Sequence, residues 1–154
     1  MKALGDFLRS ASSALRAAGL EPHITEPGPE LGIEVESPGR LYSVRVPSPG
    51  PYPMEVWVGL TVASPVVFGA LREREEIVSS ALGEGRLGWN PHPDGGGWLG
   101  MCHQIAMSPA DLGPDEGRAA AARLLTLHAL VENGRWGEPR RVATSRRPRL
   151  RLTT

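Results

Sequence analysis

The 154-residue chain has little of several residue types, and each shortage excludes a class of protein. Its single cysteine, Cys102, rules out an intrachain disulfide, and aromatic residues make up 5 % of the chain. No stretch approaches the ~18 apolar residues of a membrane span. The N-terminus also lacks the ~7–15 apolar residues of a signal peptide. We therefore expect a cytoplasmic protein whose stability comes from an ordinary core, since a chain of this length buries about 68–70 % of its unfolded surface.

Glycine and proline, by contrast, are abundant, with 19 and 15 residues, or 34 of 154. This share is below the ~25–30 % typical of disordered chains. Gly19 and Gly83 follow apolar periodic segments as helix stops, and Pro38–Gly39 lies in a turn between two strands. The proline-rich segment 47–53 predicts an exposed loop, because proline donates no backbone hydrogen bond.

The formal net charge of zero conceals a strong segregation. Residues 1–138 contain all 17 acidic residues and 11 of the 17 basic ones, a net charge of −6. Residues 139–154 contain no acid and carry +6, from Arg140, Arg141, Arg146, Arg147, Arg149 and Arg151. Such a tail could bind nucleic acid or another acidic partner. Alternatively, it packs on the acidic body of its own subunit or of a second one.

Hydrophobic periodicity predicts an α+β domain over residues 1–138, with residues 139–154 as a basic tail. Apolar residues three and four apart predict helices over 3–19, 65–82 and 114–133, and alternation predicts strands over 31–36, 41–46, 54–62, 86–90 and 98–107. Short turns between consecutive strands favour antiparallel pairing. We expect a sheet of about five strands with helices mainly on one face, in the order αβββαββα.

This order resembles that of the YbjN-like proteins and the type III secretion chaperones (CesT-like). The local pattern that carries the resemblance is a helix end at Ala81–Gly83, a strand, an Asp-Gly turn at 93–97, another strand and a last amphipathic helix that ends near Trp136. The resemblance covers about residues 3–136, without the proline-rich loop or the arginine tail. It implies a homodimer that binds other proteins or peptides.

Candidate chemical groups do not combine into a catalytic or metal site. His92, Cys102 and His103 lack the paired spacing of zinc ligands. Adjacent strand residues point to opposite faces, so Cys102 and His103 cannot share an ion or act as nucleophile and base. Asp94 and the three glycines after it predict a hairpin turn rather than a phosphate loop, because a strand follows. We expect no metal, no cofactor and no enzymatic activity.

The more informative residues are tryptophans. If Val56 and Leu99 face the helices, the strand alternation places Trp57, Trp98 and Cys102 on the opposite face, where tryptophan is unusual unless the surface is an interface. One interpretation is a partner-binding surface formed by Trp57, Trp98, Cys102 and Trp136. The other is that the C-terminal segment with Trp136 covers this face within one chain.

The sequence therefore predicts a non-enzymatic protein-binding module, chaperone- or adaptor-like, that acts as a homodimer and binds a further protein. The alternative is a nucleic-acid-associated accessory protein that binds through the six tail arginines.

Overall fold

The computed structural model describes residues 2–25, 30–47, 54–106 and 111–136. The predicted tail and most of the proline-rich loop lie outside these ranges. The described elements follow one another in this order: α1 (Lys2–Ala17), β1 (His23–Ile24), β2 (Glu30–Ser37), β3 (Arg40–Pro47), β4 (Met54–Val62), α2 (Pro65–Glu73), α3 (Glu75–Leu82), β5 (Arg86–Pro91), β6 (Gly97–Ala106) and α4 (Pro114–Asn133).

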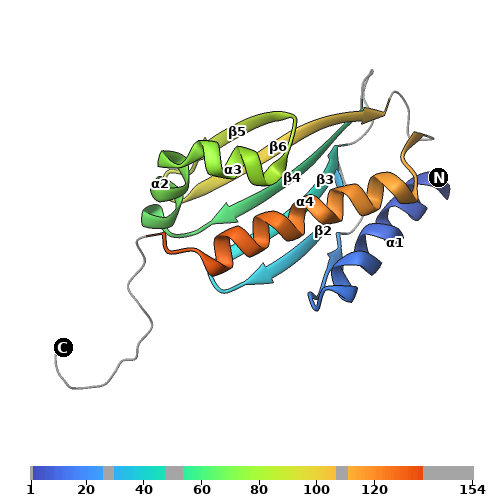
Figure 1. Ribbon diagram of the computed structural model, residues 1–154, viewed down its shortest axis with the longest axis horizontal. Helices are drawn as coiled ribbons and strands as arrows, with labels where there is room; N and C mark the ends of the chain where they lie inside the picture. The colour runs from blue at the N-terminus through green and yellow to red at the C-terminus, as the bar shows by residue number, and fades with distance from the viewer. Residues whose placement is uncertain (1, 26–29, 48–53, 107–110, 137–154) are drawn as a thin grey trace.

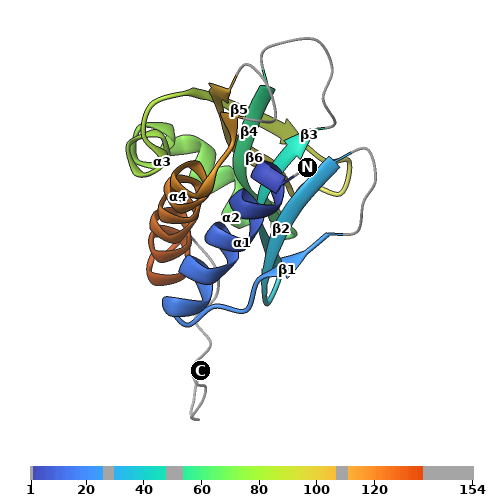
Figure 2. The same cartoon turned by 90° about the vertical axis from the view of Figure 1, so that its right-hand side faces the viewer.

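The strands form one antiparallel sheet with the order β1-β2-β3-β4-β6-β5. Figure 1 shows α4 lying over the sheet and running roughly along the strands, and in Figure 2 the helices lie together on one side of the sheet. The α+β class, the antiparallel sheet and the one-sided helical layer are therefore confirmed. The sheet has six strands instead of about five, because the two-residue strand β1 pairs with the edge of β2.

The helix predicted over 65–82 is two helices, α2 and α3, that meet at Arg74. Ser64 caps α2 as its sequence position indicates, since its hydroxyl oxygen accepts from the backbone N–H of Val67 at 3.2 Å. At Arg74 the backbone leaves the helical region, with φ −118° and ψ 43°. The apolar stripe continues across this break, so both short helices contribute buried residues to the core, and α3 packs against α4.

The core fills the space between the helices and one face of the sheet. Every second residue of β4 from Val56 to Val62 is buried there, as are Ile33 and Val35 on β2. From the helical layer, α1 and α4 contribute two facing apolar stripes: Phe7, Ala11, Leu15, Ala120, Ala121, Leu124 and Leu127. Residues of opposite phase on the strands therefore face away from the helices, and they define a second surface.

Candidate functional site: the open face of the sheet

We call the side of the sheet that faces away from the helices the open face. Among the described residues, the helices that pack on the sheet do so from the other side, where the core lies. The strand register arranges the outward residues of the four strands β3–β6 in three rows across the open face. These rows are Arg45–Trp57–Cys102–Arg86, Ser43–Gly59–Gly100–Gly88 and Leu41–Thr61–Trp98–Asn90.

The middle row of small residues forms a seat for the two tryptophan rings. A Cβ atom at Gly59 would lie 2.9 Å from Nε1 of Trp98, and one at Gly100 would collide with the same indole ring. The Trp98 ring thus lies flat over both glycines. The ring of Trp57 lies beside it, with the centroids 5.4 Å apart and the planes tilted by 56°. The pair forms a half-buried aromatic ridge at the centre of the open face, as the strand alternation predicts.

Arg86 of β5 connects the ridge to Cys102. Its guanidinium lies 5.8 Å from the ring centroid of Trp57, and its Nη2 donates to Oε2 of Glu55 at 3.3 Å and to the Cys102 sulfur at 3.5 Å. Burial, followed by the hydrogen bond with Glu55 and the charge of that residue, raises the pKa of the Cys102 thiol to about 11. Because the thiolate is the nucleophilic form, Cys102 acts as a packing residue at neutral pH.

His103 lies on the opposite face from Cys102, as expected for adjacent strand residues. It is 5 % exposed, and its Nε2 has no hydrogen-bond partner within the described chain. Burial and the nearby charge of Arg123 lower the pKa of His103 to about 4, against a hydrogen bond to the backbone of Glu84 that raises it. His103 is therefore a neutral core residue. Within the ranges that the structure describes, no group of three or more potential ligands could hold a metal ion.

Trp136 does not join the other predicted interface residues. It is 4 % exposed within the core cluster on the helix side, and its Nε1–H donates to the carbonyl oxygen of Val131 at 3.1 Å. The guanidinium of Arg74 lies 5.8 Å from its ring centroid. The interpretation in which Trp136 covers the open face is therefore wrong. Trp57, Trp98 and Cys102 lie together on the open face. Trp136 instead packs between the end of α4 and the α2–α3 junction.

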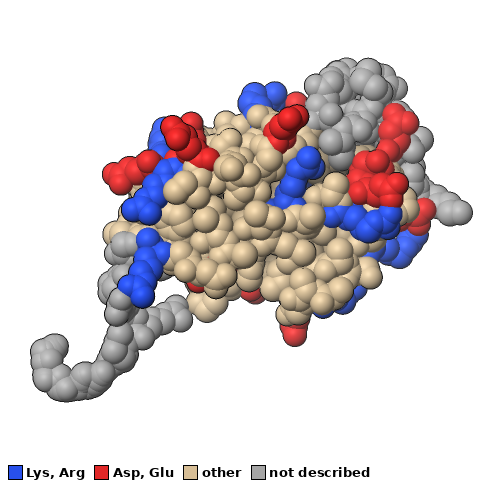
Figure 3. Space-filling model, viewed as in Figure 1, with Lys and Arg blue, Asp and Glu red and all other residues tan. Residues whose placement is uncertain are grey.

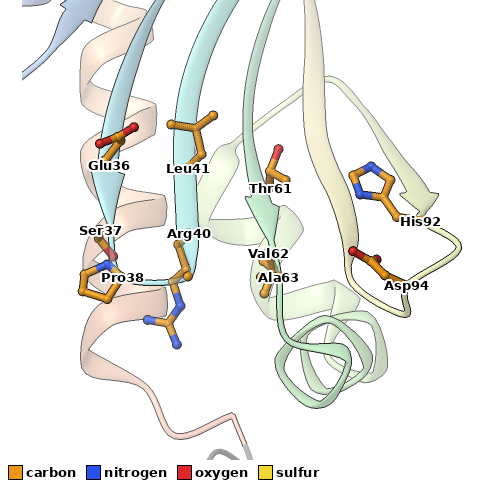
Figure 4. Close-up of a pocket in the computed structure, with 11 residues that line it drawn as sticks. Glu36, Ser37, Pro38, Arg40, Leu41, Thr61, Val62, Ala63, His92 and Asp94 are labelled. Carbon is orange, nitrogen blue, oxygen red and sulfur yellow. The ribbon is translucent and has the colours of Figure 1, made fainter.

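At one end of the open face the sheet is hollowed into a groove of about 650 Å³. Figure 4 shows Glu36, Leu41, Thr61 and His92 in a row across the strands, on the side that faces away from the helices. The β2–β3 turn forms one wall and the β5–β6 hairpin the other. The lining residues are Glu36, Ser37, Pro38, Gly39, Arg40, Leu41, Thr61, Val62, Ala63, His92 and Asp94.

The β5–β6 wall is a hairpin, as the sequence around Asp94 predicts. The Oδ1 of Asp94 accepts from the backbone N–H of Gly96 at 3.1 Å, and the N–H of His92 donates to the Gly96 carbonyl at 2.8 Å. This turn exposes the Asp94 side chain at the groove. The sequence interpretation treats Asp94 only as a turn residue, and the groove itself depends on strand register that no local pattern reveals.

A polar cluster behind the β2–β3 turn anchors the other wall. Glu132, in the last turn of α4, accepts from the side chains of Ser37 at 3.1 Å, Arg40 at 2.9 Å and Tyr42 at 2.5 Å. Burial would raise the pKa of Glu132, but the hydrogen bonds from Tyr42 and Arg40 and the Arg40 charge lower it below its ordinary value. Burial, with the hydrogen bond and charge of Glu132, raises the pKa of Tyr42 far above its usual value near 10.

The six tail arginines lie outside the described residues. On the described surface, Figure 3 shows that Lys and Arg side chains alternate with Asp and Glu around the margin of that view. Neither sign forms a separate patch there. The strongest concentration of one charge in this chain is therefore the tail sequence itself.

Comparisons with known proteins identified no relative of this chain. The chain matches no protein-family model, no curated protein and no solved structure. Within the described part of the chain, no helix is both long and apolar enough to cross a membrane.

Proposed function

We propose that this protein is a non-enzymatic protein-binding module, adaptor- or chaperone-like, that works in the cytoplasm as a homodimer formed through the open face of its sheet. The observation that carries the proposal is the aromatic ridge of Trp57 and Trp98 on a sheet face that no helix of the described residues covers. Tryptophan is favoured at the centres of protein interfaces. The same function is implied by the resemblance to secretion chaperones, which the comparisons neither support nor oppose.

The charges on the open face favour a second copy as the partner. Glu34 lies on β2 and Arg86 lies on β5, toward opposite sides of the sheet. A twofold axis parallel to the strands and close to β4 would place β2 of one copy opposite β5 of the other, with Glu34 one row, about 7 Å along the strand, from Arg86. Sheets pack face to face at a distance of about 10 Å, which long side chains can bridge.

The size of the face fits a stable dimer. The five strands β2 to β6, each about 4.8 Å wide and on average about eight residues long at ~3.3 Å per residue, give a projected area of roughly 24 Å by 26 Å, or about 600 Å². Stable interfaces bury about 800 Å² of accessible surface on each partner. Because accessible area exceeds projected area on a surface with protruding side chains, the open face is large enough.

Size-exclusion chromatography with light scattering tests the proposal. We expect the full chain to elute with twice its 16.5 kDa mass and a Trp57→Glu variant to elute as a monomer. Val66→Glu is the matched control, because Val66 is 54 % exposed on α2, in the helical layer. Far-UV circular dichroism shows that the variants fold. A monomeric wild-type chain at about 100 µM, well above the Kd of an ordinary specific dimer, would refute the proposal.

A second candidate function rests on the tail sequence. Six arginines without an acid within 16 residues are suited to phosphate contacts, whose strength falls steeply with salt. A gel-shift at low salt with single- and double-stranded DNA and RNA compares the full chain with a variant in which all six arginines are glutamine. Binding by the full chain alone supports nucleic-acid association, and equal absence of binding removes it.

A further inference from the structure

We propose that the groove at the turn end of the open face binds the arginine-rich segment 139–151 of the same chain. This inference goes beyond the proposed function, because the groove lies to one side of the aromatic ridge and its occupation does not require a dimer. It names an occupant for the end of the open face beyond the aromatic ridge. Three independent features support it: the charge of the groove, its shape and its distance from the end of α4.

The groove offers two carboxylates, and the described residues form no ion pair with either of them. Glu36 and Asp94 are exposed on opposite walls, and Glu34 lies two residues before Glu36 on the same side of β2. The one arginine in the lining, Arg40, is 10 % exposed and forms an ion pair with Glu132 behind the turn. Its charge is thus balanced outside the groove. The two carboxylates therefore make the groove attractive to cations.

The floor of the groove suits an arginine side chain in particular. Leu41 and the carbon atoms of Thr61 lie between the two acidic walls, and Val62 and Ala63 complete the apolar part of the lining. Arginine buries its three-carbon stem along apolar surface while its planar guanidinium donates to carboxylates. A volume of about 650 Å³ accommodates a short peptide segment, comparable to a drug-sized ligand.

The chain leaves α4 beside the groove. Glu132 contacts Ser37 and Arg40, both of which line the groove, and the last described residue, Trp136, follows four residues later. An extended chain spans at most ~3.3–3.6 Å per residue, so Arg140 and Arg141 lie within about 30 Å of chain from Glu132. Tethering on so short a linker gives effective concentrations in the millimolar range.

Charge also favours the tail over a nucleic acid as the occupant. Carboxylates on both walls repel phosphates, whereas the tail carries +6 against −6 on residues 1–138. An ordinary acidic surface would attract the tail without holding it in one position. The groove combines two carboxylates with apolar lining residues, so it favours binding of one tail segment in a defined position.

Trypsin protection in the full-length chain tests the proposal, because trypsin cleaves after arginine. We would measure by mass spectrometry how fast cuts appear within residues 140–151 at low salt. The test variant is Glu36→Gln with Asp94→Asn, in which asparagine keeps the oxygen that accepts from Gly96. The control is Glu73→Gln with Glu76→Gln, two exposed residues of the helical layer. Each pair of substitutions removes two negative charges.

Two exposed ion pairs together contribute about 1 kcal/mol, which is about a fivefold change in a docking equilibrium. We expect the groove variant to be cut three- to fivefold faster than wild type, and the control variant to be cut at the wild-type rate. High salt should raise the wild-type rate toward that of the groove variant. Equal rates for all three chains would overturn the proposal.

The same assay separates the proposal from its competitors. Protection that rises with protein concentration would place the tail in a second copy and overturn the intrachain contact. Protection that appears only after a 20-base-pair DNA duplex is added would do the same in favour of nucleic acid. Trp57→Glu should retain protection as a monomer, so failure of the dimer and failure of the docked tail give different results.

Discussion

Removal of the Glu132 carboxylate should destabilise the fold, because this one group binds the C-terminal end of α4 to the β2–β3 hairpin. In Glu132→Gln the amide oxygen can still accept, but Arg40, whose side chain is 10 % exposed, loses the carboxylate charge that lies 2.9 Å from its guanidinium. Breaking a fully buried ion pair costs about 3–5 kcal/mol. Since Glu132 itself is 27 % exposed, water screens part of this loss. We therefore expect a decrease of about 2 kcal/mol in the free energy of unfolding at pH 7.

The pH dependence of this decrease in stability distinguishes the loss of an ion pair from other effects of the substitution. The folded state lowers the pKa of Glu132, so its stabilisation is fully present above the unfolded value near 4.3. It is lost as the pH falls through the lower, folded-state pKa. The difference between wild type and Glu132→Gln should thus be largest at pH 7 and should shrink as the pH falls below about 4.

Urea unfolding followed by tryptophan fluorescence measures both effects. Glu76→Gln serves as the control, because Glu76 is exposed on α3 and should change stability by less than about 0.5 kcal/mol. In a thermal scan the Glu132 variant should melt about 4–8 °C below wild type. If the two variants unfold alike at pH 7, or if the gap persists unchanged in acid, the cluster does not stabilise the fold as described.

Two further predictions concern the two faces of β6. Because the folded state lowers the pKa of His103 to about 4, stability should fall as the pH drops from about 6.5 to 4, where the unfolded chain binds the extra proton. A His103→Gln variant should show a flatter profile in urea titrations across this range, and an identical slope would contradict the assignment. On the open face, Gly100→Ala should displace the Trp98 ring and lower stability by about 1–3 kcal/mol. Gly88→Ala should lower stability by less than half as much, since a Cβ there lies at an ordinary contact distance of 3.8 Å from Trp57. Equal losses of stability in thermal scans would show that the Trp98 ring does not depend on the glycine at position 100.

The strands were predictable because a period of two assigns each residue to one of two faces. In β4 the alternation predicts that Val56, Val58 and Leu60 face the helices, and all three are buried. The break at Arg74 was not predictable in the same way. The apolar stripe runs on from α2 into α3 without a gap, because both short helices cover the same layer.

The candidate site was only partly predictable. The alternation along the strands is enough to place Trp57 and Trp98 on the open face. The groove could not be predicted in this way, because it depends on the β2–β3 turn and the β5–β6 hairpin lying at the same end of the sheet. Glu132 lies 90 residues from Tyr42, so no local pattern connects them. The available signal was a tyrosine on a core-facing position, since its buried hydroxyl requires a polar partner.

The pairing of α1 with α4 also has a consequence for synthesis on the ribosome. The two helices pack side by side (Figure 2), and the Ser10 hydroxyl donates to the Pro114 carbonyl at 2.8 Å across a separation of 104 residues. At roughly 5–20 residues per second, α4 is completed about 6–23 s after α1. During that interval the apolar side of α1 lacks the helix against which it finally packs. A nascent chain of this protein thus exposes an amphipathic segment early, and the packing of α1 is completed only after α4 has been made.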